Sequence, residues 1–420
     1  MTRWPTATIG SACTVFSGGT PSKGNSAYWR GTIPWVSAKD LKADRIFDAE
    51  LHISQQACDE SAAKMAPVGS LLMLVRGMGL ANGIQVGEVT APVAFNQDLR
   101  AIVPPPGVES RFLLLALRHR LADGGKGVLS SAAHGTLKID ADALRQVEFP
   151  VPPPHEQRRI VAILDEAFAG IATAKANVEK NLRNTREWSA RQLATALGAA
   201  SAGGRSDTLE RLVAPSCTLS YGIVQPGDEV SGGLPVVRPV DLGDKTVYAD
   251  GLKRIDPALA RSYARTTLEG NDLLLCVRGT TGTVAMADPT LAGANVTRGI
   301  VPIRFDPLTV SQALGYYLLR SEPVQTQIRA KTYGTALMQI NIGDLRKIVI
   351  AFPPLEKQAA LVEQLDAIQE AADQLTNVYA RKLAALDELK HSLLHQAFTG
   401  GLSPQNDRPT QWHGLQMCTQ

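Results

Sequence analysis

The second half of this 420-residue chain repeats part of the first half. The segment LRQVEFPVPPPHEQRRIVAILDEAF begins at Leu144, and LRKIVIAFPPLEKQAALVEQLDAIQ begins at Leu345, so the two align without a gap at an offset of 201 residues (345 − 144). Both copies predict a short strand that is followed by a pair of prolines and a long helix. A period this large exceeds that of solenoid repeats and indicates a duplicated half-molecule. We therefore expect one task to be performed twice, at two related places.

Each repeated segment predicts an unusually long helix. The first runs from about His155 to Gly198, and the second from about Glu356 to Phe398. Prolines precede both helices and glycines mark their ends, which is the usual order of start and stop signals. Forty or more residues at a rise of 1.5 Å give a helix of roughly 65 Å.

Apolar residues in both helices alternate at spacings of four and three, which is typical of a coiled-coil seam. Because the two patterns match at the same offset, we predict that the helices pair with each other, antiparallel and about a pseudo-twofold axis. The alternative is that each helix packs on its own domain. The predicted seam residues are Ile160, Leu164, Ile171, Val178, Trp188, Leu361, Leu365, Ile368, Leu375, Leu386, Leu389 and Leu393.

The segments that precede the helices match more weakly, at nearly the same offset. IPWVSAKDL (residues 33–41) corresponds to LPVVRPVDL (234–242), GSLLMLVRG (69–77) to GNDLLLCVRG (270–279), FNQDLRAIVP (95–104) to ANVTRGIVPI (294–303), and HGTLKID (134–140) to YGTALMQIN (333–341). Short apolar runs bounded by turn residues predict strands. We therefore predict an α+β fold, with two β-rich domains joined by the two antiparallel helices. The sequences between the strands diverge, as in recognition domains that share a scaffold.

Composition and motifs exclude several classes of protein. The five cysteines form no CxxC pair, so neither a zinc site nor a disulfide framework is expected. We see neither a signal peptide nor an apolar run of membrane-spanning length, which predicts a cytoplasmic protein. His391 and His395 lie one helical turn apart but lack the HExxH pattern, and cations near a helix C-terminus explain them without a metal.

Motifs for catalysis are also absent. The chain has no Asn-Pro dipeptide, and so no Asn-Pro-Pro-aromatic motif of amino-methyltransferases. It has no GK[ST] sequence for ATP and no GxSxG nucleophile elbow. These absences favour a protein whose catalysis is supplied by partners.

The order YWRGTIPWVSAKDL, LVRG, HGT and PPPHEQRRIVAILD, followed by a long helix and then repeated, resembles the specificity subunit of type I restriction–modification systems. The resemblance covers the chain up to about Gly401. It implies that residues 1–150 and 201–349 are DNA target-recognition domains, each reading one part of a split target. It also implies that residues 151–200 and 350–400 are spacer helices, which leaves 401–420 as a tail. The second half departs from the pattern, because LPVVRPVDL lacks the tryptophan of IPWVSAKDL.

The same resemblance implies the partners. It predicts binding to double-stranded DNA and to methyltransferase subunits, two in number, and leaves open an association with restriction and translocase subunits. No cofactor is expected on this chain, since S-adenosylmethionine for adenine methylation belongs to the modification subunit. The alternative function is a duplicated coiled-coil scaffold for proteins without a DNA role.

Candidate DNA-contacting residues lie at strand ends and in loops. Arg76 and Arg278, each followed by glycine, suit a phosphate or a guanine edge, and equally a surface turn. Asn and Gln can pair with adenine, and Asn also caps turns. Gly18-Gly19-Thr20 with Lys23 can cradle a phosphate, although a plain surface turn is the preferred interpretation. The full set is Lys23, Ser37, Lys39, Arg76, Asn96, Gln97, Lys138, Arg238, Arg278, Thr280, Asn295, Thr297, Arg298, Lys331 and Tyr333.

Overall fold

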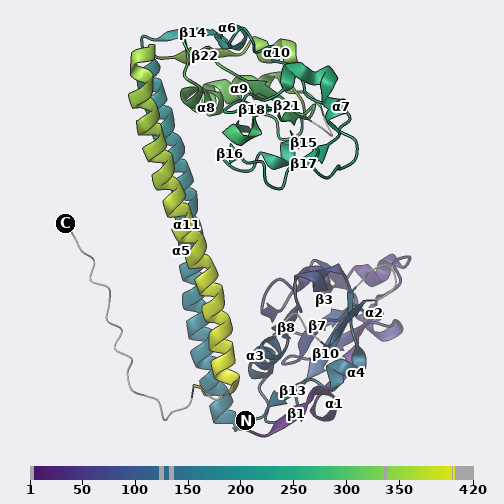
Figure 1. The fold of residues 1–420 in the computed structure, drawn as a ribbon. Helices are drawn as coiled ribbons and strands as arrows, with labels where there is room; N and C mark the ends of the chain where they lie inside the picture. Colours follow the sequence, from purple (N-terminus) through teal and green to yellow (C-terminus); the bar gives the residue numbers. More distant parts are fainter. Residues whose placement is uncertain (1–3, 123–126, 132–136, 335–337, 400, 403–420) are drawn as a thin grey trace, which may run out of the picture. The chain divides into compact units, whose positions relative to one another are not determined.

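The computed structural model describes residues 4–122, 127–131, 137–334, 338–399 and 401–402. The chain divides into two compact units: unit 1 comprises Met1–Val178 and Arg381–Gln420, and unit 2 comprises Glu179–Ala380. Each unit holds a β-rich domain, one part of helix α5 (Pro154–Ser201) and one part of helix α11 (Leu355–Thr399) (Figure 1). The predicted α+β fold class is confirmed.

Unit 1 builds its domain from short strands and four short helices. The helices are α1 (Ile9–Ala12), α2 (Gln55–Glu60), α3 (Ser110–Arg120) and α4 (Ala141–Arg145). The strands are β1 (Thr6–Thr8), β2 (Thr14–Ser17), β3 (Ile33–Val36), β4 (Arg45–Ile46), β5 (Leu51–Ile53), β6 (Lys64–Ala66), β7 (Leu71–Leu74), β8 (Val86–Val89), β9 (Val93–Phe95), β10 (Leu99–Val103), β11 (Leu129–Ser131), β12 (Leu137–Ile139) and β13 (Glu148–Pro150).

The sheets of unit 1 surround a core centred on β7, all four residues of which are buried. A five-stranded sheet has the order β2-β10-β7-β8-β4, and a four-stranded sheet has the order β5-β3-β9-β6. Two-stranded sheets pair β1 with β13 and β11 with β12. Helix α3 buries residues 112–117 in the same core.

Unit 2 repeats this plan. Its strands are β14 (Arg205–Thr208), β15 (Leu234–Val237), β16 (Thr246–Val247), β17 (Lys253–Ile255), β18 (Leu273–Cys276), β19 (Val284–Ala287), β20 (Asn295–Val296), β21 (Ile300–Ile303) and β22 (Val349–Phe352). Its helices are α6 (Leu209–Leu212), α7 (Pro257–Ala260), α8 (Gln312–Arg320), α9 (Glu322–Lys331) and α10 (Ile342–Arg346). The sheet orders are β16-β19-β18-β21, β17-β15-β20 and β14-β22. Strand β18 takes the central place that β7 has in unit 1.

The repeated Pro-Pro-x-x-x-Gln motif has the same structural role in both units. Gln157 is fully buried, accepts a hydrogen bond from the Glu109 N–H at 2.9 Å and donates to the carbonyls of Gly107 and Pro152, both at 2.8 Å. Gln358 accepts from the Ser311 N–H at 2.8 Å and donates to the carbonyls of Thr309 and Pro353, at 2.8 and 3.0 Å. The motif therefore fastens the first turn of each long helix to the start of α3 or α8.

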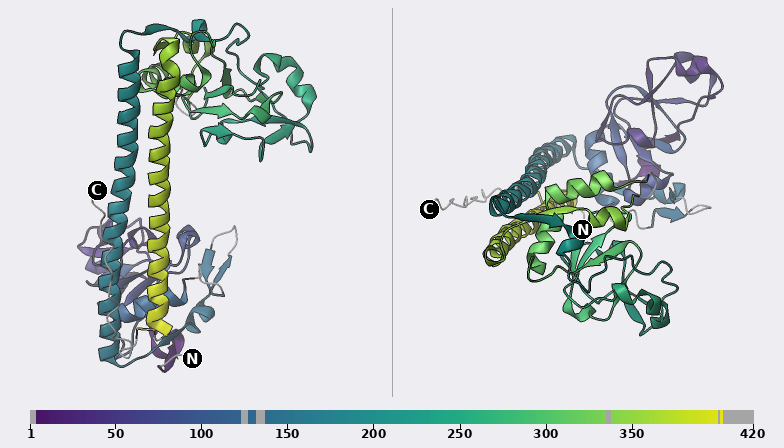
Figure 2. Two further views of the ribbon diagram at one scale, coloured as in Figure 1. Left: turned by 60° about the vertical axis from the view of Figure 1, so that its left-hand side comes forward. Right: turned by 90° about the horizontal axis from the view of Figure 1, so that it is seen from above.

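Within each unit, the parts of α5 and α11 lie side by side in antiparallel orientation, as predicted (Figure 2). In unit 1 the start of α5 and the end of α11 share a core that contains Ile160, Leu164, Leu394, Ala397 and Phe398. In unit 2 the end of α5 and the start of α11 share a core that contains Ala196, Leu197, Leu361 and Leu365.

The seam departs from the predicted register at three residues. Trp188, Leu375 and Leu389 are 42%, 41% and 46% exposed, whereas Thr185 and Ala372 are buried. One line of seam positions keeps the seven-residue spacing and stays buried, as Val178 to Thr185 and Leu365 to Ala372 show. On the other line, the residue that follows each exposed position is the half-buried one: Ser189, Thr376 and Lys390. The other predicted seam residues are buried or half-buried: Ile160, Leu164, Ile171, Val178, Leu361, Leu365, Ile368, Leu386 and Leu393.

Within the described residues, no helix is both long and apolar enough to cross a membrane. The four cysteines of that part of the chain are free: Cys13, Cys58, Cys217 and Cys276. No three His, Cys, Asp or Glu side chains among the described residues lie close enough together to hold a metal ion.

Candidate nucleic-acid interface

In unit 1 the arginine that ends the central strand is paired with a second chain segment. Arg76 forms a β-bridge with Lys138, and Lys138 is paired with Ser130 between β11 and β12. The bridge is flanked by hydrogen bonds from the Gly77 N–H to the Leu137 carbonyl (3.1 Å) and from the Ile139 N–H to the Val75 carbonyl (2.8 Å). Directly paired residues place their side chains on the same face of a sheet. Ser130, Lys138 and Arg76 therefore form a row, which we call the first row.

Unit 2 builds an equivalent row. Arg278 forms a β-bridge with Gln339, and Gln339 is bridged in turn to Tyr333. The same two backbone hydrogen bonds recur, from the Gly279 N–H to the Met338 carbonyl (2.8 Å) and from the Ile340 N–H to the Val277 carbonyl (3.0 Å). Tyr333, Gln339 and Arg278 form the second row.

A glycine follows the arginine of each row for a conformational reason. Gly77 has φ +133° and Gly279 has φ +89°, in the region that L side chains rarely adopt. The chain therefore turns away directly after each arginine, which leaves the arginine at the end of its strand.

A tight turn lies beside each row, and it carries Gln97 in unit 1 and Arg298 in unit 2. The valine directly before the arginine of each row binds this turn. The Val75 N–H donates to the Asp98 carbonyl (2.9 Å), and the Val277 N–H donates to the Gly299 carbonyl (2.8 Å). Gln97 and Arg298 are both exposed, and Gln97 accepts a hydrogen bond from the Thr20 hydroxyl at 2.6 Å.

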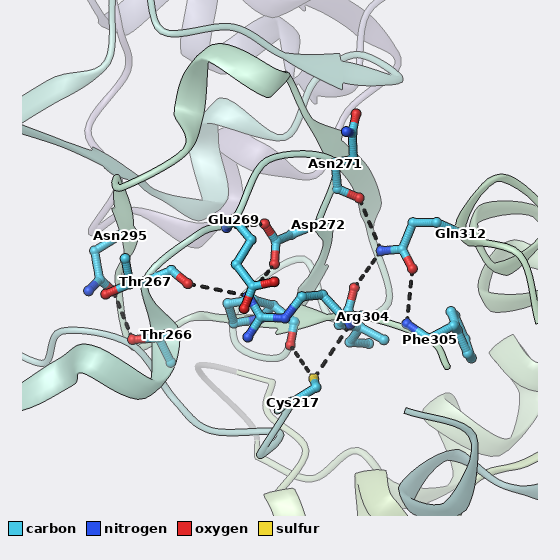
Figure 3. A network of polar contacts seen from close by, with 12 residues as sticks. Cys217, Thr266, Thr267, Glu269, Asn271, Asp272, Asn295, Arg304, Phe305 and Gln312 are labelled. Atoms are coloured by element: carbon cyan, nitrogen blue, oxygen red, sulfur yellow. Dashed lines mark hydrogen bonds and ion pairs between the residues drawn. The ribbon is translucent and has the colours of Figure 1, made fainter. Parts of the chain in front are cut away.

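Three predicted contact residues are buried instead. Asn96 hydrogen-bonds the Asp98 N–H at 3.1 Å, and Thr297 donates to the Val237 carbonyl at 3.3 Å. Asn295 is fully buried and accepts a hydrogen bond from the Thr266 hydroxyl at 2.7 Å (Figure 3). Its amide also donates to the Tyr263 carbonyl at 3.1 Å. These side chains satisfy backbone and neighbouring groups, so their polar atoms are not presented to a ligand. Asn96 closes its own turn, whereas Asn295 and Thr297 bind segments that are distant in the sequence.

The loop after β3 and its counterpart after β15 are held by an aspartate. Asp40 accepts hydrogen bonds from the N–H and the hydroxyl of Ser37, both at 2.8 Å. Asp241 accepts from the Arg238 N–H at 2.7 Å and pairs with the Arg238 guanidinium at 2.9 Å. Ser37 and Arg238 therefore each hold their own loop closed, while Lys39 is exposed in the same loop as Ser37.

The remaining predicted residues are scattered. The glycine pair at 18–19 packs against the backbone of Phe95 and Ala62, where even a Cβ atom would collide, and Gly19 is buried, so packing within the domain accounts for these two glycines. Lys23 and Thr280 are exposed, and Lys331 is half-buried. The HGT sequence of the first half (134–136) and Thr335 lie outside the described residues.

Sequence reasoning did not single out Ser130, Gln339 or Tyr221, and of these Ser130 has a buried hydroxyl without a hydrogen-bond partner among the described residues. Ser130 and Gln339 join the rows only through backbone pairing, although Gln339 stands 201 residues after Lys138 and the repeat offers that signal (339 − 138). Tyr221 donates a hydrogen bond to the Ile340 carbonyl at 3.2 Å, beside the second row. Burial raises the pKa of the Tyr221 phenol, and the neighbouring Tyr333 raises it further.

A family model described as "Type I restriction modification DNA specificity domain" matches residues 1–182 and 228–383. These two stretches make up most of the chain. The chain belongs to the type I restriction–modification DNA specificity family. The two matched stretches of this specificity family contain all the residues of the two rows.

Relatives in the specificity family include two *Escherichia coli* proteins. The EcoBI specificity subunit is 23% identical over 289 residues, which are 64% of this chain and 61% of the relative. The EcoR124I/EcoR124II specificity subunit is 31% identical over 163 residues, which are 38% of this chain and 39% of the relative. The chain thus spans less than two thirds of the length of these relatives.

Solved structures support the same fold. One chain, from work on complex assembly and conformational transition of the type I R-M system, matches with a TM-score of 0.69 at 21% identity and covers 95% of this chain and 98% of that one. The HsdS subunit from *Thermoanaerobacter tengcongensis* matches with a TM-score of 0.55 at 18% identity and covers 95% and 97% of the two chains. At these identities the likeness shows the fold of the specificity family.

Proposed function

We propose that this chain is the specificity subunit of a type I restriction–modification complex and recognises a bipartite target in double-stranded DNA. The observation that carries the proposal is the pair of equivalent rows. Each domain places polar side chains on the same backbone frame at the end of its central strand, but the side chains differ between the two. A shared frame with different polar groups suits two domains that read two different half-sites, because base edges are distinguished by their donor and acceptor patterns.

Local charge supports DNA as the ligand. Arg76 and Lys138 supply cations in the first row, and Arg278 and Arg298 supply them at the second. The net charge of the chain is only +3, so attraction to phosphates depends on this local placement. A protein scaffold without a DNA role would not require cations at both equivalent strand ends.

We further propose that partner subunits supply the catalysis. In this proposal the chain binds no cofactor itself, and S-adenosylmethionine on a modification subunit donates the methyl group to adenine. Two methyltransferase subunits are expected because the scaffold occurs twice. An exposed aromatic side chain also recurs at the same repeat position, Phe47 at 66% exposed and Tyr248 at 61%. Restriction and translocase subunits are further partners, and cytoplasmic DNA is the substrate.

Methylome sequencing of the host tests the proposal. Deleting the gene for this chain should erase adenine methylation at one split motif and leave every other methylated motif unchanged. Complementation with the intact gene should restore it. An unchanged methylome after deletion, in cells that express the chain and its partners, would contradict the function.

A further inference from the structure

The arginines of the two rows are held differently. Arg76 is exposed. Arg278 is half-buried, and its Nε atom is shielded from solvent without a hydrogen-bond partner among the described residues. Its terminal nitrogens are not shielded in this way, and they make no hydrogen bond within the described residues. The stem of Arg278 is therefore packed against protein while the end of its guanidinium remains open to a ligand.

A buried donor without a partner is rare, because losing water without gaining a hydrogen bond costs roughly 1–3 kcal/mol. The backbone around Arg278 is also fixed on both sides. Val277 donates to the Gly299 carbonyl and Gly279 donates to the Met338 carbonyl, both at 2.8 Å. The side chain thus starts from a restricted position, which reduces the entropy lost when it binds. Such an arrangement favours a contact that depends on direction over a general attraction to phosphate.

The neighbour of Arg278 in the row has complementary chemistry. Gln339 is bridged to Arg278 on one side and to Tyr333 on the other, and its side-chain amide has no partner among the described residues. Paired residues in a sheet lie about 5 Å apart at Cβ, and successive base pairs lie about 3.4 Å apart, so two such side chains can reach adjacent base pairs. Arginine can make two hydrogen bonds to guanine, and glutamine two to adenine.

We propose that Arg278 and Gln339 are the specificity-determining residues of the second half-site, where Arg278 reads a guanine and Gln339 reads an adenine at a neighbouring base pair. This inference rests on the proposed function. The equivalent residues of the first domain are Arg76 and Lys138, and lysine lacks the amide that pairs with adenine. The two half-sites should therefore differ at the base pair that this position reads, because the first domain has Lys138 where the second has Gln339.

The test uses the chain assembled with its methyltransferase subunits and a library of duplexes randomised in both half-sites. Arg278→Lys keeps the positive charge but removes the guanidinium, which can donate two hydrogen bonds to one base. Gln339→Lys introduces the lysine that the first row has at the equivalent position, Lys138. Arg205→Gln is the control, because Arg205 is an exposed cation on β14 of the same unit. Melting temperatures and assembly of each complex identify variants that fail to fold.

Arg278→Lys should reduce the preference for guanine at one position of the second half-site by about 10- to 100-fold. Gln339→Lys should change the preferred base from adenine to guanine at a neighbouring position. Neither variant should alter the first half-site, and Arg205→Gln should alter no preference.

Either variant could instead lose affinity equally for every sequence, with the slope of log affinity against log salt concentration reduced by about one. That result would identify a phosphate contact and overturn the inference. Unchanged preferences in folded, assembled variants would overturn it as well. A wild-type complex without any sequence preference would instead refute the proposed function.

Discussion

Two buried glutamines show how single residues connect the long helices to the domains. Gln157 and Gln358 are 0% and 1% exposed, and each makes three hydrogen bonds to backbone groups at equivalent places. Truncating either side chain leaves one N–H and two carbonyls without partners in the interior, and unsatisfied buried groups are costly.

We expect Gln157→Ala and Gln358→Ala each to destabilise their own unit by about 2–4 kcal/mol. Hydrogen exchange should show lost protection in α3 for Gln157→Ala and in α8 for Gln358→Ala. Gln192→Ala, at an exposed position of α5, is the matched control and should leave both units unchanged. Equal protection in wild type and both variants would mean that the helix starts are held by other contacts.

Asp44 gives a prediction that depends on pH. Burial alone would raise the pKa of this carboxyl, but hydrogen bonds and charges from Arg118 and Arg111 outweigh burial and lower it. Arg111 also pairs with Asp165 of α5 at 2.6 Å. A carboxyl whose pKa is lowered by folding stabilises the fold above its unfolded pKa, and this contribution is lost as the pH falls through the folded pKa.

Asp44→Asn should therefore be less stable than the wild type at neutral pH, and the difference should shrink as the solution is acidified. Urea unfolding at a series of pH values measures it. Glu166→Gln, at an exposed position of α5, should show no comparable trend. A deficit for Asp44→Asn that stays constant down to pH 2 would show that the carboxylate charge is not its cause.

At the scale of elements, local pattern predicted the helices and central strands well. Both long helices extend within three residues of the predicted limits, because prolines, glycines and apolar spacing act locally. The rows could not be predicted, since the bridge from Arg76 to Lys138 depends on how distant strands pair. The burial of Asn295 could not be predicted either, because its hydrogen-bond partner Thr266 lies 29 residues away in the sequence. Trp188 was predicted in the seam, but the neighbouring Ser189 is the half-buried residue there, a difference of one position that apolar spacing does not resolve.

The paired helices yield a prediction about spacing. Lys175 of α5 and Asp387 of α11 form an ion pair, so the two helices are in register there. Inserting seven residues after Lys175 and seven after Leu386 should preserve the seam and lengthen the pair by about 10 Å. That length corresponds to about three base pairs. If the helices act as the spacer, the gap between half-sites should widen by this amount.

Inserting two residues at each place is the control, since it rotates the following turns by about 200° and turns the apolar stripes apart. This variant should lose helix pairing or assembly. Methylation by the seven-residue variant with an unchanged gap would show that the spacing is set elsewhere, within the domains or the partner subunits.

At the scale of the whole molecule, duplication explains both what is shared and what differs. The glutamine anchors, the bridge geometry and the glycine after each arginine recur in both units, whereas the residues beside them differ, as Lys138 and Gln339 illustrate. The scaffold was predictable because repetition exposes it. The repeat also locates equivalent positions such as Lys138 and Gln339, but it does not say what each side chain contacts, because the side chains differ between the halves.

Exchange of one domain tests whether the two domains read their half-sites independently. Residues 1–150 are replaced by the corresponding segment of another specificity subunit that reads a different target, and the methylated motif of the assembled complex is sequenced. One part of the split motif should change to that of the donor, while the part read by residues 201–349 should stay the same. If both parts change together, the two domains do not read their half-sites independently, and the account is contradicted.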